Sequence, residues 1–164
     1  SLEDEQAALE AARALDPTTL DDPGLRAPGI GEAASVVAKF GPVRGALLRL
    51  QQEFAAQEAG AVLDGRDIGT VVCPHADVKI FVVADAVVRA KRRLRELRER
   101  GEEAQLADVV AMIRKRDERD TARADSPMRP AEDALLLDTT DLSIDGAFDA
   151  AIELIKRKIG RLGA

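Results

Sequence analysis

The sequence is poor in residues that bind soft metals or stack on bases. Its 164 residues include one cysteine, Cys73, one histidine, His75, four phenylalanines, and neither tryptophan nor tyrosine. A single cysteine excludes an internal disulfide and a cysteine-based zinc site. So few aromatic rings give little platform for nucleic acid bases. We therefore expect no metal held by protein ligands and no nucleic acid partner.

Long apolar runs and a net basic charge are also missing. No run approaches the roughly 20 apolar residues of a membrane helix, and no secretion signal opens the sequence. The net charge of -6 disfavours general binding to phosphate backbones. An apolar content of 46% in 164 residues is enough for one domain with a core. We expect a cytoplasmic globular protein without a membrane partner, which binds any anion at a local basic cluster.

Helical patterns dominate the first third of the chain. Residues 3–15 are rich in Ala, Leu and Glu with an acidic first turn, which predicts a short helix. Prolines and glycines between positions 17 and 29 predict a loop. Apolar residues recur at helical spacing over 32–57, where Gly41 and Pro42 must divide the pattern. Two consecutive helices are expected there.

Three short, continuous apolar runs predict strands. They lie at residues 61–64, 78–84 and 134–139. Continuous apolar character over so few residues is typical of strands buried on both faces of a parallel sheet.

Helical stretches follow these strands. One covers 84–100 and a second covers 103–124, separated at Gly101. A third, over 144–160, ends at Gly160, which would suit a helix cap. Strands that alternate with helices predict an α/β layer fold.

The first candidate site is LDGRDIGT, which displays Asp64, Arg66 and Asp67 between Gly65 and Gly69. In an open parallel sheet, ligands bind beyond the carboxyl ends of the strands, and this segment leaves the predicted strand 61–64 at that end. The glycines suit a sharp turn with close backbone approach. The alternative is a charged surface turn whose arginine pairs with a neighbouring aspartate.

The second candidate lies in IRKRDERDTAR, where Arg116, Asp120 and Arg123 fall on one helix face. Such a fork could hold a phosphate while the carboxylate takes sugar hydroxyls, and Arg119 would strengthen the positive field. The alternative is a salt-bridge ladder on a solvated face.

The third candidate is RAKRRLRELRER, residues 89–100. Arg89 and Arg93 are i, i+4 neighbours that could grip a polyphosphate. A solvated helix face is the simpler reading. A basic helix that docks on RNA is a further possibility, which the acidic net charge disfavours.

Taken in order, LDGRDIGTVV, PHADVKIFVVAD, VRAKRRLREL and IRKRDERDTARADSPMRPAEDALLLDTTDLSID closely resemble bacterial cytidylate kinase. The resemblance extends back through GEAASVVAKFGPVRGALLRLQ and covers residues 31 to about 159. It implies an α/β, parallel-sheet nucleoside monophosphate kinase-like fold of the P-loop type. Residues 1–58 would be a shortened helical region that binds the nucleoside monophosphate. Residues 59–164 would be the core, with a mobile lid around 98–115.

The resemblance implies transfer of the γ-phosphoryl group of ATP, with Mg²⁺, to CMP or dCMP by a monomeric enzyme. It assigns cytosine recognition to Ser35, Arg44 and Asp67. It assigns the ribose and phosphate to Arg116, Asp120 and Arg123, with Asp64 and Arg66 completing the wall. The catalytic charges would be Arg116, Arg119 and Arg123, and the ATP side would use Arg89 and Arg93.

One motif of the family is missing. The family carries a Gly-x-x-x-x-Gly-Lys-Ser/Thr phosphate loop on its first strand, and this sequence contains no Gly-Lys dipeptide. The first strand and the loop are therefore missing, and we expect the chain alone to be unable to hold ATP productively. Either an N-terminal segment is absent before Ser1, or the chain is a catalytically dead remnant or module that still binds CMP. The intact CMP-side residues favour the first explanation.

Overall fold

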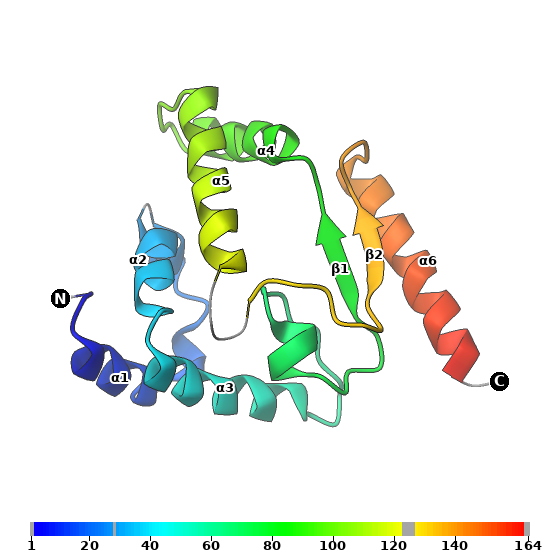
Figure 1. Cartoon of the computed structure of the whole chain (residues 1–164), viewed down its shortest axis with the longest axis horizontal. Coiled ribbons are helices and arrows are strands. Elements are labelled where there is room, and N and C mark those ends of the chain that lie inside the picture. Colours follow the sequence, from blue (N-terminus) through cyan, green and yellow to red (C-terminus); the bar gives the residue numbers. More distant parts are fainter. Residues whose placement is uncertain (1, 28, 123–126, 163–164) are drawn as a thin grey trace. The chain divides into compact units, whose positions relative to one another are not determined.

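The computed structural model, drawn in Figure 1, describes residues 2–27, 29–122 and 127–162. The chain divides into two compact units. The first unit is Ser1–Leu63 and the second is Asp64–Ala164. The sequence placed a boundary at 58/59. The roles predicted for the two parts remain predictions.

Helices are the only regular secondary structure among the described residues of the first unit. Its elements are α1 (Glu5–Arg13), η1 (Pro17–Thr19), η2 (Pro23–Arg26), α2 (Ile30–Val37) and α3 (Gly41–Ala55), of which η1 and η2 are short 3₁₀ helices. The Asp4 side chain caps α1 by accepting from the Ala7 backbone N–H at 3.0 Å. Because α3 starts at Gly41-Pro42, the proline stands where a helix needs no N–H donor. The prediction of two consecutive helices is confirmed.

The second unit holds the sheet. Its elements are η3 (Ile68–Val72, a π-helical turn), β1 (Ile80–Val83), α4 (Ala86–Glu99), α5 (Leu106–Thr121), β2 (Leu135–Asp138) and α6 (Ile144–Leu162). The strands β1 and β2 are parallel, with Ile80 opposite Leu135 and Val83 opposite Asp138. Between them the chain passes through α4 and α5, because parallel neighbours need a long connection. Two of the predicted strands and the alternation with helices are confirmed (Figure 1).

The predicted strand at 61–64 is wrong. These residues have no strand assignment, and Val62 is 96% exposed. A strand is maintained by hydrogen bonds to a neighbouring strand. In the described part of the chain, strand pairing joins only β1 and β2. The apolar run therefore lacks the partner that would make it a strand.

The helices α4 and α5 form a hairpin that turns at Gly101. Gly101 has a φ of 77°, and the N–H groups of Gly101 and Glu102 donate to the carbonyls of Arg98 and Leu97 at 2.9 Å each. Ala90, Leu94 and Val109 form a buried cluster between the two helices, flanked by partly buried Leu97, Ala104, Leu106, Val110 and Ile113. The two helices and their break are as predicted.

The last helix is longer than predicted. Because α6 continues to Leu162, Gly160 lies inside the helix and does not cap it. Positive φ angles are found at Gly29, Gly60 and Gly101 among the described glycines. Gly160 does not have the positive φ of a glycine cap.

Candidate functional site

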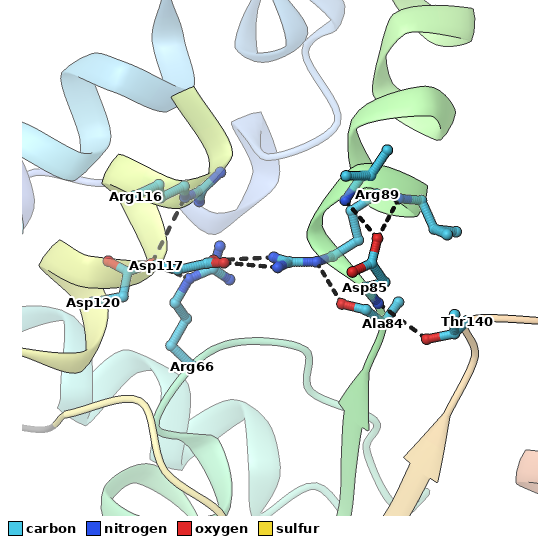
Figure 2. A network of polar contacts seen from close by, with 10 residues as sticks. Arg66, Ala84, Asp85, Arg89, Arg116, Asp117, Asp120 and Thr140 are labelled. Atoms are coloured by element: carbon cyan, nitrogen blue, oxygen red, sulfur yellow. Dashed lines mark hydrogen bonds and ion pairs between the residues drawn. The ribbon is translucent and has the colours of Figure 1, made fainter. Parts of the chain in front are cut away.

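Helix α5 carries two carboxylates one turn apart, Asp117 and Asp120, and each is paired with an arginine from another segment. Arg89 of α4 reaches Asp117, and Arg66 of the 64–67 loop reaches Asp120 (Figure 2). The cluster therefore joins the second candidate of the sequence to parts of the first and the third.

Asp120 is the buried centre of the cluster. Asp120 is 1% exposed. Its carboxylate accepts a hydrogen bond from Arg66 Nε and lies 3.7 Å from Arg116 Nε. Its backbone carbonyl also accepts from the Met128 N–H at 2.9 Å. A buried carboxylate is strongly destabilising unless cations and donors compensate it. The predicted contact of Arg116 with Asp120 is confirmed, and Asp120 does not belong to a solvated ladder.

The partner of Arg66 is not the one that the surface-turn alternative predicts. Arg66 pairs with a carboxylate 54 residues away in the sequence rather than with a neighbouring surface aspartate. Its side chain is 35% exposed while that of Asp120 is 2% exposed. The partly exposed guanidinium of Arg66 is thus paired with the buried carboxylate of Asp120.

Asp117 and Arg89 form the second pair. Arg89 donates from both terminal nitrogens to the two carboxylate oxygens, at 3.0 and 2.7 Å, and from Nε to the Ala84 carbonyl at 3.0 Å. The pKa of Arg89 is raised, chiefly by the hydrogen bond to Asp117. No sequence motif pointed to a role for Asp117. Its position three residues before Asp120 was the available signal, because both then lie on one face of α5.

The 64–67 loop runs into the π-helical turn η3. The Asp67 carbonyl accepts from the Val71 N–H at 2.8 Å, and a Cβ on Gly65 would lie 2.8 Å from Ile68 Cγ1. Any larger residue at position 65 would therefore force the Ile68 side chain to shift, which favours glycine there. Asp64 is exposed and Asp67 is half-buried. Because no strand precedes the loop, the predicted placement at a strand exit is wrong, and the Arg66 ion pair anchors the loop on α5 instead.

The remaining predicted arginines differ in their surroundings. Arg93 pairs with Glu96 on its own helix at 2.9 Å, in an exposed i, i+3 contact. Arg119 is half-buried on α5. Arg123 lies outside the described residues. Joint action of Arg93 with Arg89, and of Arg123 with Arg116, stays a prediction.

Ser35 and Arg44 belong to the first unit, where they lie on α2 and α3. Both are half-buried and both have polar or charged partners. Their approach to the residues of the second unit stays a prediction.

Neither a metal cage nor a membrane span is found in the described part of the chain. Over those residues, no group of three or more His, Cys, Asp or Glu side chains could hold a metal ion. No helix there is both long enough and apolar enough to cross a bilayer.

The cluster offers guanidinium donors beside carboxylates. Arg66, Arg89 and Arg116 lie against Asp117 and Asp120, and Asp85 also acts electrostatically on Arg89. Guanidinium groups bind phosphate oxygens in pairs, and a nearby carboxylate can accept hydroxyl protons. In open parallel sheets, ligands bind beyond the carboxyl ends of the strands, and Arg89 contacts Ala84 at the carboxyl end of β1.

Sequence comparisons identify the family. The family model for cytidylate kinase matches residues 10–157. The cytidylate kinase of Xanthobacter autotrophicus is 59% identical over 161 residues, which are 98% of this chain and 77% of the relative. Those of Rhodopseudomonas palustris strain BisB18 and Bradyrhizobium diazoefficiens are 57% and 55% identical, each over 94% of this chain and 73% of the relative. The protein is therefore a kinase, an enzyme of the phosphotransferase class. It belongs to the cytidylate kinase family.

Proposed function

We propose that this kinase transfers the γ-phosphoryl group of ATP to CMP or dCMP. The observation that carries the proposal is the buried Asp120, compensated by Arg66 and Arg116, in a chain of the cytidylate kinase family. The family resemblance assigns Arg116 and Asp120 to the ribose and phosphate of the acceptor and Arg66 to the wall beside them. Burial of a carboxylate beside two arginines is costly to the fold and supports a role in binding.

Recognition of the base follows from the chemistry of cytosine. Its pairing edge presents an amino donor beside two acceptors, so a selective pocket needs a carboxylate and donor groups. Asp67 takes the amino group in this proposal, and Ser35 and Arg44 supply the donors. Asp64 completes the wall of the pocket.

Phosphoryl transfer needs alignment and charge neutralisation more than covalent chemistry from the protein. Arg116, Arg119 and Arg123 neutralise the transferred group in this proposal, and Arg89 and Arg93 hold ATP. Mg²⁺ enters with ATP as part of that substrate. The hairpin turn within residues 98–115 closes as a lid and excludes water. The enzyme acts in the cytoplasm and as a monomer in this proposal.

The 164 residues alone do not use ATP productively in this proposal, because they contain no Gly-Lys dipeptide to form the phosphate loop. The same observation favours a second candidate, a nucleotide-binding module that retains CMP without catalysis. Calorimetry on the 164-residue chain with CMP and ATP in turn detects this state. Heat from CMP without heat from ATP is expected.

The deciding experiment uses an extended enzyme, defined as the 164 residues preceded by a segment with a Gly-x-x-x-x-Gly-Lys-Ser/Thr loop. We expect it to release ADP from MgATP only when CMP or dCMP is present. Equal turnover of AMP and CMP would reject the assignment. If calorimetry shows that CMP binds but CMP never increases the release of ADP, the result would support the binding module instead.

A further inference from the structure

One carboxylate of the cluster has no role in the proposed function. We infer that Asp117 is a positioning residue, which fixes the guanidinium of Arg89 in the orientation that receives the phosphates of ATP. This inference rests on the proposed function, which assigns Arg89 to ATP.

Hydrogen bonds hold the guanidinium of Arg89 both at its terminal nitrogens and at Nε. Asp117 accepts from both terminal nitrogens, while the Ala84 carbonyl accepts from Nε (Figure 2). An arginine side chain has many rotamers, so a carboxylate that fixes its plane removes the entropy cost of ordering it when a ligand binds. The guanidinium has five N–H donors, and these three contacts leave two for ligand oxygens.

The pair also lies where a ligand can reach it. Ala84 directly follows β1, so the Nε contact ties Arg89 to the carboxyl end of a strand in a parallel sheet. Ligands of such sheets bind beyond those strand ends. The side chains of Arg89 and Asp117 are 37% and 28% exposed, so a solvated polyphosphate can approach.

Asp120 provides a matched comparison on the same helix. It lies one turn from Asp117, yet its side chain is 2% exposed and its partners are Arg66 and Arg116. The face of α5 thus presents one carboxylate to the acceptor-side arginines and another to the ATP-side arginine. Substitution of each aspartate by asparagine removes one charge and preserves the shape.

The first test is calorimetry of CMP on the 164-residue chain. Asp117→Asn is expected to change the dissociation constant of CMP by less than about twofold, whereas Asp120→Asn is expected to raise it by more than about tenfold. An Asp117→Asn variant that weakens CMP as strongly as Asp120→Asn would overturn the inference.

The second test is steady-state kinetics of the extended enzyme. Asp117→Asn is expected to raise the KM for ATP by about tenfold with the KM for CMP unchanged within about twofold. Arg89→Ala should raise the KM for ATP by a similar factor. The double variant should raise it no further, because both residues act through one guanidinium. Asp117→Glu, which keeps a carboxylate, should recover part of the loss.

A role in stability alone predicts a different pattern. The control Asp133→Asn breaks another ion pair of the same unit, that with Lys79. If Asp117→Asn lowers the melting temperature as Asp133→Asn does but leaves both KM values unchanged, the positioning role is rejected and the proposed function stands. A wild-type extended enzyme that releases no ADP with CMP would reject both.

Discussion

Arg66 and Asp120 are 54 residues apart in the sequence and form an ion pair in which the aspartate is 1% exposed. The pair joins the 64–67 loop to α5, and Arg116 lies on the other side of the carboxylate. Within the second unit, it brings together residues that the sequence treats as two separate motifs.

Removal of Arg66 is predicted to destabilise the fold. Arg66→Met leaves the buried Asp120 carboxylate with a weaker set of partners, which should lower the free energy of unfolding by about 1–3 kcal/mol. Urea unfolding followed by circular dichroism measures this. The control is Lys156→Met on α6, which removes an exposed i, i+3 pair with Glu153 and should change stability by less than about 0.5 kcal/mol. Equal effects of the two variants would contradict the burial argument.

Asp67 is predicted to set the preference for cytosine. Asp67→Ala should raise the KM of the extended enzyme for CMP by about tenfold or more, because the amino group of the base loses its acceptor. The kcat should fall less than kcat/KM does. Asp77→Ala, at an exposed aspartate after the same turn, is the control and should leave the KM unchanged. An unchanged KM in Asp67→Ala would remove Asp67 from the base pocket.

The turn of the α4/α5 hairpin is predicted to need glycine. Gly101→Ala forces an L-residue to a φ of 77°, which should cost about 1–2 kcal/mol. The control is Gly160→Ala, which lies inside α6, where the added Cβ would meet no described atom within 4 Å beyond its chain neighbours and the backbone of its own helix. That variant should instead stabilise the protein by about 0.5–1 kcal/mol. Thermal melting of both variants is the measurement, and shifts of the same sign would contradict the account.

Asp133 is predicted to titrate below its ordinary pKa of 3.8, because Lys79 Nζ donates to its carboxylate at 2.8 Å. A pKa that is lower in the folded state contributes stability above about pH 3.8, and this stability is lost as the pH falls through the folded-state pKa. A carboxyl NMR titration of Asp133 measures the pKa. Lys79→Met should raise it toward the ordinary value, and an unchanged titration in that variant would exclude Lys79 as the cause.

The sequence predicted the helices better than the sheet. Helical periodicity and a glycine break are local properties, so α4, α5 and the turn at Gly101 were predictable. A strand depends on a neighbour at any distance along the chain, which is why the local apolar pattern at 61–64 wrongly predicts one. Gly160 was mistaken for a cap because a glycine inside a helix costs only about 1 kcal/mol, which packing can offset.

The candidate site was predictable in part for the same reason. The contact of Arg116 with Asp120 follows from i, i+4 spacing on one helix. The contacts of Arg66 with Asp120 and of Arg89 with Asp117 join different segments, so they depend on the tertiary fold. The pairing of Arg89 with Asp117 was therefore missed, although Arg89 itself had been singled out.

The most direct test of the central claim is an NMR titration of the 164-residue chain with CMP, observed at the arginine Nε–H resonances. Binding at the Asp120 cluster predicts that the resonances of Arg66 and Arg116 shift together and saturate at one dissociation constant. Arg93, paired with Glu96 on the exposed side of α4, serves as the internal reference and should not move. Saturable binding of CMP with Arg66 and Arg116 unshifted would contradict the account.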